Sequence, residues 1–245
     1  MTIFEIRPLS CPHCQSTYVE SYGDSMRTAP YSDGEPVTLH GDRFIPALIC
    51  HACERPIFTG EGTVVPSAEA GSAINSPKRA RLPNALEAIA IANGKTDQPQ
   101  LERSLRRFSW LLDNDRWIYE QEIEQIKCSR EGTQYVPPKT AHMSEDAARN
   151  LARLIDLSNR SNVLERIEIA DIQRTLGDFE KALESIGDLE DLHGEICRET
   201  GQDSDQFVVM HWMSRAHACR NLSLHSISAV FPLSEALLLG NDRES

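Results

Sequence analysis

The sequence predicts an α+β fold, in which a small N-terminal β domain precedes an all-α domain of helical hairpins. Two observations predict it. Two C-x-x-C cysteine pairs lie within the first 53 residues, next to short strand-like segments. After residue 84, apolar residues recur at the three- and four-residue intervals of amphipathic helices. We therefore expect a β domain at residues 1–62, a linker rich in Gly, Pro, Ser and Ala at 63–83, and a repeat-like helical domain at 84–240.

The two cysteine pairs predict a metal site. Cys11 and Cys14 form a first hook, and Cys50 and Cys53 form a second. Each hook can fold into a tight turn that presents two thiolates, and the two hooks together complete the tetrahedral S4 shell of a structural Zn²⁺, with Zn–S distances of about 2.3 Å. We therefore expect a zinc ribbon with one ion per chain. Because four thiolates leave no position for water, the ion is expected to be structural and not catalytic.

Other readings of the hooks are less consistent with the sequence. A redox C-x-x-C pair is typical of a βαβ unit, which the flanking residues do not suggest. Two disulfides need an oxidising compartment, whereas no basic, apolar signal segment follows Met1.

The remaining cysteines lie in helical sequence, where we expect buried thiols. Together with the absence of a signal segment, this favours a cytoplasmic protein. His13 and His51 lie inside the hooks, and we expect both rings to point away from the ion. The remaining cysteines are Cys128, Cys197 and Cys219.

Strand and helix signals can be placed in order along the chain. Residues 17–19 and 44–49 are the strand candidates, the second running into the second hook. Asn84 is a helix cap for residues 85–91, which stop at Gly94. Asp97 and Gln100 form a capping pair for the next helix, which should end near residues 114–115. The aromatic side chains at 108, 110, 117 and 119 are expected in the core, and a third helix is expected to open at Ser144.

Residues 162–187 contain the clearest supersecondary signal, a helical hairpin. Its two helices meet at Gly177, with Ala170 and Ala182 at a close crossing and Phe179 at the start of the second helix. This pattern is similar to one tetratricopeptide repeat. No comparable unit recurs about 34 residues away on either side, and an array needs about three repeats, so we expect a repeat-like domain and not a solenoid.

In the order of these parts, the chain resembles uncharacterised bacterial zinc-ribbon proteins with a tetratricopeptide-repeat-like helical C-terminal domain. Gln15 and Glu54 stand where ribbon hooks commonly carry glycine. The resemblance implies an architecture and transfers no catalytic residue. The motifs that carry it are YSDG at 31–34, LRRFSW at 105–110 followed by NDR at 114–116, and RTLGDF at 174–179.

The net charge of the chain helps to distinguish between nucleic-acid binding and protein binding, the two usual functions of zinc ribbons. The chain has 25 basic and 37 acidic residues, a net charge of −12. Nucleic-acid binding needs a basic surface that releases counterions from phosphates. The basic cluster of Lys78, Arg79 and Arg81 falls in the predicted linker, where a solvated cluster is the simpler reading. The balance therefore favours a protein partner over nucleic acid, and no apolar stretch approaches the length of a membrane span.

We therefore interpret the chain as a non-enzymatic zinc-binding protein that acts as a protein-interaction module or adaptor. A nucleic-acid-associated zinc ribbon is the alternative. An enzyme is a third possibility, although the sequence contains no phosphate-binding loop, nucleophile elbow, zinc-protease motif or dinucleotide-binding fingerprint. The sequence leaves open the partner, the pathway, the oligomeric state, whether the ribbon and the helices share a core, and the role of residues 205–245.

Overall fold

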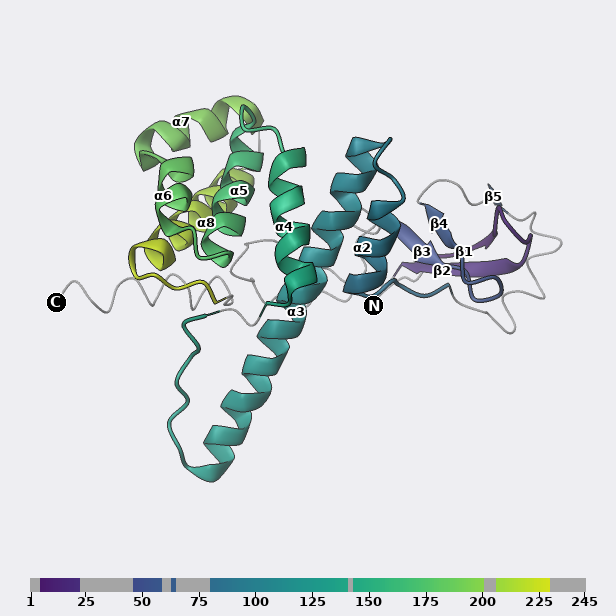
Figure 1. Cartoon of the computed structure of the whole chain (residues 1–245), viewed down its shortest axis with the longest axis horizontal. Helices are drawn as coiled ribbons and strands as arrows, with labels where there is room; N and C mark the ends of the chain where they lie inside the picture. Colours follow the sequence, from purple (N-terminus) through teal and green to yellow (C-terminus); the bar gives the residue numbers. More distant parts are fainter. Residues whose placement is uncertain are drawn as a thin grey trace. The chain divides into compact units, whose positions relative to one another are not determined.

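The computed structural model describes residues 5–22, 46–58, 63–64, 80–140, 143–200 and 206–229 (Figure 1). Over these residues the fold is α+β, as predicted. The described residues up to Leu112 form one compact unit, and those from Asp113 onward form a second. The strands are β1 (Glu5–Ser10), β2 (Thr17–Tyr22), β3 (Ala47–Ile49), β4 (Pro56–Phe58) and β5 (Thr63–Val64), and the helices are α2 (Ala85–Asn93), α3 (Pro99–Glu131), α4 (Glu145–Leu157), α5 (Val163–Thr175), α6 (Phe179–Ile186), α7 (Leu189–Thr200) and α8 (Gln206–Leu224).

Each cysteine hook is the turn of an antiparallel hairpin. β1 pairs with β2 from Glu5 opposite Tyr22 to Ser10 opposite Thr17, so the first hook joins the two strands. β5 pairs with the other edge of β1, which gives the order β2-β1-β5. β3 pairs with β4, with Ala47 opposite Phe58, and the second hook joins them. Both predicted strand segments overlap observed strands, β2 and β3.

The ribbon and the first helices share a core. Ala47 of β3, Ala92 of α2 and Leu105 of α3 are each fully buried in one apolar cluster. Two of these three side chains are methyl groups, which lets strand and helix backbones approach closely. Phe58, Ile91 and Leu101 pack around them. This cluster answers a question that the sequence leaves open, because α2 and the first part of α3 lie in the same compact unit as the ribbon strands.

Helix α3 is much longer than predicted. We expected it to end near residues 114–115, but it continues to Glu131, for 33 residues in all. It also begins at Pro99, a favoured first helical residue, and not with the Asp97–Gln100 pair. The polar pair at 114–115 does not stop the helix, because Asn114 is buried at 1% exposure within it. Gly132, at φ 67°, ends it.

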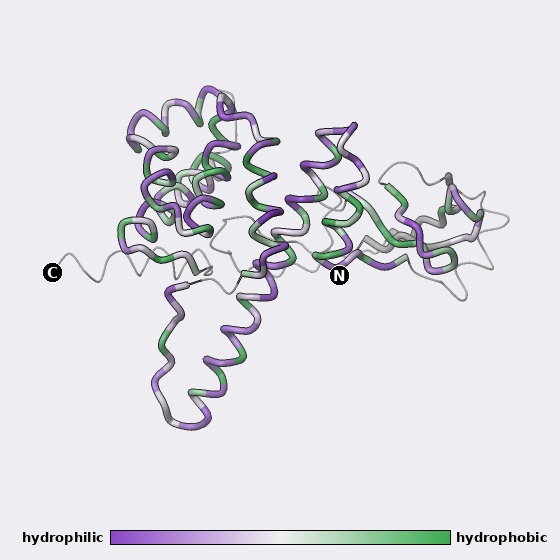
Figure 2. Tube along the Cα trace, viewed as in Figure 1, coloured by the Kyte–Doolittle hydropathy of each residue, from purple (hydrophilic) through white to green (hydrophobic). Residues whose placement is uncertain are grey.

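The second unit is built from packed helices. α5 and α6 form the hairpin predicted at 162–187, closed by Gly177 at φ 86°. Figure 2 shows polar and apolar residues interspersed along these helices. None of the described helices combines the length and the apolar character that a membrane span requires. The buried core draws on α5, α6, α7 and α8, and its members are Val163, Ile167, Ala170, Ile186, Leu192, Ile196, Ala216 and Cys219.

Several sequence expectations can be compared with side-chain burial. Phe108, Trp110 and Trp117 are buried, as expected, but Tyr119 is 55% exposed. The helix continues past the part that is packed, so the last of the four aromatic residues lies on its solvent-facing side. Of the three cysteines outside the hooks, Cys219 is buried, whereas Cys128 and Cys197 are only partly buried, on α3 and α7. The YSDG motif at 31–34 lies outside the described residues.

Candidate metal centre

The first hook is a compact turn held by three contacts of its own backbone. The amide of Cys11 donates to the carbonyl of Ser16 at 2.9 Å, which closes the β1–β2 hairpin. The amide of Gln15 donates to the carbonyl of Cys11 at 3.0 Å. The amide of His13 points at the sulfur of Cys11, with an N···Sγ distance of 3.4 Å. An amide directed at sulfur stabilises a thiolate, which is the form that binds metal.

The second hook repeats this pattern contact for contact. The amide of Cys50 donates to the carbonyl of Arg55 at 3.0 Å, and the amide of Glu54 donates to the carbonyl of Cys50 at 3.0 Å. The amide of Ala52 lies 3.4 Å from the sulfur of Cys50. The two hooks are therefore copies of one local structure, each directing the first cysteine and the amide two residues later in the same way.

The residue after each hook adopts a left-handed backbone conformation. Gln15 has φ 61° and Glu54 has φ 56°. This is the conformation for which glycine is the usual choice, and a residue with a Cβ atom adopts it at a cost of roughly 1 kcal/mol. The missing glycines therefore leave the turns intact. Each strained residue is held by its own amide, through the bond to the carbonyl of Cys11 or Cys50.

The hooks bring four sulfur atoms together. The sulfurs of Cys11, Cys14, Cys50 and Cys53 all lie within 4.8 Å of one another. The distance from Cys11 to Cys53 is 3.9 Å and that from Cys14 to Cys50 is 3.8 Å. A tetrahedral ion about 2.3 Å from each sulfur sets the sulfurs about 3.8 Å apart, whereas a disulfide needs about 2.05 Å. The four cysteines can therefore hold one metal ion between the hooks.

One side of the cysteine cluster is buried and the other is exposed to solvent. Cys11 and Cys50, the first cysteine of each hook, are fully buried, whereas Cys53 is partly buried and Cys14 is exposed. Leu9 and Ile57 are buried against the inner pair. The inner sulfurs have little water to solvate a negative charge, so a bound cation is the natural counter-charge for them.

The thiols of the two hooks differ in how readily they ionise. The Ser16 hydroxyl, 3.2 Å from the sulfur, lowers the pKa of Cys14 to about 6. At Cys53, the hydrogen bond from the Arg55 amide lowers the pKa, but burial and the neighbouring thiols outweigh it and raise the pKa to about 11. Burial raises the pKa of Cys11. One thiol thus ionises readily while two resist, and a metal ion would displace the remaining protons.

The hook histidines are not part of this group of ligand atoms. The ring Nε2 of His13 lies 3.0 Å from the carbonyl oxygen of Pro56, so this ring ties the first hook to β4 of the second hairpin. His51 is partly buried beside Cys50. The contact with Pro56 directs the His13 ring at β4, and the role of His51 stays a prediction.

Arg81 of the predicted basic cluster is engaged within the first unit. Its guanidinium donates to both carboxylate oxygens of Glu87, at 2.7 and 2.6 Å. Glu87 in turn accepts from the amide of Asn84 at 2.9 Å and completes the predicted capping of α2. The pair lowers the pKa of Glu87 to about 2. Lys78 and Arg79 lie outside the described residues.

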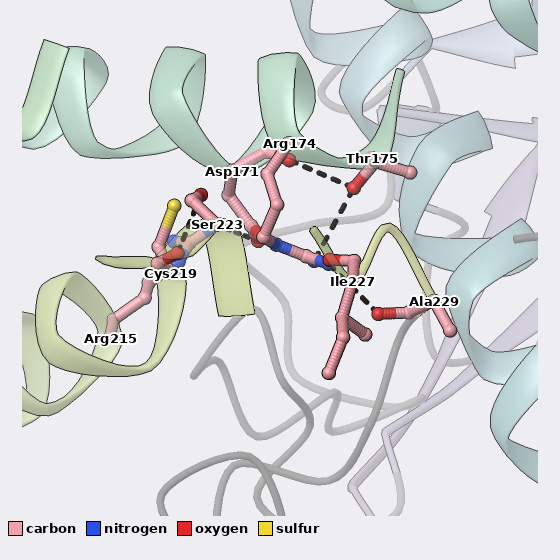
Figure 3. Close-up of polar contacts among 8 residues, drawn as sticks. All are labelled: Asp171, Arg174, Thr175, Arg215, Cys219, Ser223, Ile227 and Ala229. Atoms are coloured by element: carbon pink, nitrogen blue, oxygen red, sulfur yellow. Dashed lines mark hydrogen bonds and ion pairs between the residues drawn. The ribbon is translucent and has the colours of Figure 1, made fainter. Parts of the chain in front are cut away.

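A second polar cluster, which sequence reasoning missed, lies in the helical unit (Figure 3). Arg174 of α5 is fully buried and donates through Nε and Nη2 to Asp171, at 3.0 and 2.7 Å. Its Nη1 donates to the carbonyls of Ile227 and Ala229, at 3.1 and 2.8 Å. With a further contact to the Thr175 hydroxyl at 3.4 Å, the guanidinium makes five hydrogen bonds, and two of them attach the chain after α8 to α5.

The same cluster contains a second buried arginine. Arg215 of α8 is fully buried, with nitrogens 3.9 Å from carboxylate oxygens of Glu168 and Asp171. Two carboxylates and two guanidiniums balance one another, which is how buried charges are normally accommodated. Burial, followed by the charge of Asp171, raises the pKa of the adjacent Cys219 thiol to about 12. A thiol with so high a pKa stays protonated at neutral pH. The contacts of the two arginines hold α5, α8 and the segment after α8 together.

Comparison of the chain with protein-family models, with curated protein sequences and with solved structures finds no match in any of the three.

Proposed function

We propose that the chain is a zinc-binding protein in which a structural Zn²⁺ holds the ribbon together and the helical unit binds a protein partner. The observation that carries the first half is the group of four thiols at tetrahedral spacing. Thiolates are soft ligands, and a closed tetrahedral S4 shell is typical of structural zinc. When bound, such an ion cross-links the two hairpins and lends its binding energy to folding.

The position of the hooks supports a structural role for the ion. Cys50 directly follows β3, whose Ala47 is buried with Ala92 and Leu105 of the first two helices. An ion at the hooks would therefore fix the strand on which α2 and α3 pack. Because all four positions around the ion would be protein sulfurs, water would have no position from which the ion could activate it.

The interaction role rests on the helical unit. The α5–α6 hairpin has the glycine turn and the buried alanines that occur in tetratricopeptide-like pairs, and such pairs commonly present binding surfaces. The exposed charges of α6 and the start of α7 are mainly acidic, with Lys181 among them. We propose a partner with a basic segment, which these carboxylates would attract. The exposed acidic residues are Glu180, Glu184, Asp188, Glu190 and Asp191.

Elemental analysis of protein purified without added metal tests the zinc site. We expect one zinc per chain, and we expect Cys50→Ser to lose it, because an incomplete thiolate shell gives up much of the binding energy. Cys128→Ser, which removes a thiol far from the hooks in sequence, is the matched control and should keep the metal. Metal-free protein, or iron in place of zinc, would contradict the proposal.

Charge reversal tests the partner. Proteins bound to the immobilised chain at low salt would be compared between wild type and the double variant Glu180→Lys, Glu184→Lys. We expect a specific protein to be lost on reversal and on raising salt. Glu145→Lys, which changes an exposed carboxylate on α4, is the control. Recovery of nucleic acid in place of protein, sensitive to salt but not to the α6 charges, would favour the nucleic-acid alternative.

A further inference from the structure

The second half of α3 carries two apolar faces, and only one of them is buried. Trp117 and Ile118 are buried, at 6% and 2% exposure. Tyr119, Ile123 and Ile126 are 55%, 47% and 48% exposed. We call these three residues the α3 stripe. Spacings of four and three residues place them on one side of the helix, along two turns. Single exposed apolar residues are ordinary, but three in register form a surface.

The α3 stripe follows the spacing of a coiled-coil interface. In a heptad written abcdefg, Tyr119 and Ile126 occupy d positions and Ile123 the a position between them. Arg116 and Arg130 occupy the a positions before and after it. The apolar part is therefore bounded by an arginine at each end, and the segment from 116 to 130 measures about 21 Å, at 1.5 Å per residue.

We propose that the α3 stripe binds the α3 stripe of a second copy of this chain, with the two helices antiparallel. The charges favour this occupant. In an antiparallel pair with Ile123 of one copy against Ile126 of the other, Tyr119 faces Arg130, where a guanidinium can lie on the aromatic ring. The proposal concerns a different surface from the zinc site and does not depend on it.

The flanking residues complete the match. In the same antiparallel register, Glu120 of one copy faces Lys127 of the other, and Glu122 faces Ser129. Glu120 and Lys127 are both well exposed, at 62% and 58% of their side chains. Within the chain Glu120 lies 4.0 Å from Arg116 and Lys127 lies 3.3 Å from Glu124, so each would exchange a solvent-exposed partner for the one across the interface. The pair occurs twice by symmetry, so the interface contains two opposite-charge contacts and no like-charge contact among these residues.

A parallel pair would be mismatched. It would place Arg116 against Arg116 and Arg130 against Arg130 at the interface, because equivalent a positions meet in parallel coiled coils. It would also place Asp115 near Glu120 of the second copy, which offsets the one favourable contact of that arrangement, Glu122 with Lys127. Like charges directly opposed at an interface oppose association, so the antiparallel arrangement is favoured.

The expected association is weak. A stable interface buries about 800 Å² on each partner, and two heptads of one helix bury less than that. Dimerisation is therefore expected to depend on concentration in the micromolar range. Sedimentation velocity of the full zinc-loaded chain, from about 1 to several hundred micromolar, would measure it. A chain that stays monomeric over this range would overturn the proposal.

Two variants separate the α3 stripe from the rest of α3. Ile123→Asp places a charge in the stripe and is expected to weaken dimerisation at least about tenfold. Gln125→Asp adds the same charge at an exposed position of the same helix outside the stripe, and should dimerise as the wild type does. Equal helix content by circular dichroism and equal zinc content would show that both variants fold. Equal dimerisation of the two variants would reject the stripe as the interface.

A charge exchange tests the direction. Glu120→Lys alone and Lys127→Glu alone should each weaken dimerisation, because each opposes like charges across the antiparallel pair. The double variant should recover it, because the two charges have only traded places. In a parallel pair Glu120 would face Asp115 and Lys127 would face Glu122, so Glu120→Lys alone would strengthen dimerisation and only Lys127→Glu would weaken it. Stronger dimerisation of the Glu120→Lys variant, or failure of the double variant to recover, would therefore exclude the antiparallel arrangement.

Discussion

Ile49 and Arg81 bond to each other through their backbones in both directions. The amide of Ile49 donates to the carbonyl of Arg81 at 2.7 Å, and the amide of Arg81 donates back at 3.1 Å. Ile49 is the residue before the second hook, and Arg81 precedes the cap of α2. The pair therefore joins the β3–β4 hairpin, which carries the second hook, to the start of the helices by main-chain bonds, independently of side chains.

Metal removal should loosen α2 as well as the ribbon. A chelator would free the second hook, and the Ile49–Arg81 bonds and the core around Ala47 would lose the strand that supports them. Hydrogen exchange is the measurement. We expect the amides of Ile49, Arg81 and the last turns of α2 to lose protection, while those of α5 and α6 keep theirs. Loss confined to the hooks, with α2 unchanged, would show that the helices do not depend on the metal.

The close approach of β3 to the helices should not tolerate a larger side chain. Ala92→Leu inserts three carbons beside Ala47 and Leu105, and overpacking of this kind destabilises by about 1–3 kcal/mol. Ala90→Leu makes the same change at an exposed position of α2 and should have little effect. Urea denaturation of the two variants and the wild type, purified in the same way, compares their stabilities. Equal midpoints would mean that this core is loosely packed.

The buried guanidinium of Arg174 should be indispensable to the helical unit. Arg174→Met removes its bonds to Asp171 and leaves that carboxylate buried, which typically costs about 3–5 kcal/mol. It also frees the carbonyls of Ile227 and Ala229, so the segment after α8 should exchange its amide hydrogens faster. Arg198→Met, at an exposed position of α7, is the control. A fall of the thermal midpoint no larger than that of the control would contradict a structural role for this cluster.

Acid sensitivity should be lower in a Glu87→Gln variant. The folded pKa of Glu87 lies near 2, below its ordinary value of 4.5. A depressed pKa contributes stability above pH 4.5, and this contribution is lost as pH falls from about 4.5 towards 2. Since both partners are partly exposed, the contribution is modest. The difference in unfolding free energy between wild type and variant should therefore shrink over this range.

At low pH, protons compete with a metal ion for the cysteine thiolates, and this affects wild type and the Glu87→Gln variant equally. The difference in unfolding free energy between the two proteins therefore reports on the Glu87 carboxylate alone. Glu145→Gln, which alters a carboxylate exposed at 92% of its side chain, is the matched control. A wild-type advantage that stays constant from pH 6 to 2 would be inconsistent with the Arg81–Glu87 pair as described.

The hooks and the α5–α6 hairpin could be predicted because their signals are local. Two cysteines at C-x-x-C spacing specify a turn, and Gly177 with the flanking apolar periodicity specifies a helix break. The union of ribbon and helices could not be predicted, because it depends on Ala47 and Ala92. Alanine fits a buried contact and an exposed helix face equally well, so nothing in the sequence marks these two as core.

Polarity misled the prediction of the end of α3, and it gave no sign of the buried cluster around Arg174. Asn114 and the neighbouring aspartates have the composition of a helix end, yet α3 continues, because tertiary packing outweighs local propensity. Glu168, Asp171 and Arg174 resemble a solvated face, yet they are buried with Arg215 of α8, some 40 residues further along the chain. A buried network of charged residues is stable only when oppositely charged partners are in contact. Because these partners are far apart in the sequence, their contact could not be predicted from it.

The burial of the first cysteine in each hook gives the site a direction of exchange. A chelator, an oxidant or a metal-donating molecule arriving from solution meets Cys14 and then Cys53, whereas Cys11 and Cys50 are shielded by the ribbon core. Loss and replacement of an ion would begin at the outer pair, with the inner pair holding it last. An ion could thus be exchanged through release by Cys14 and Cys53 while Cys11 and Cys50 still bind it, without the ribbon having to unfold first.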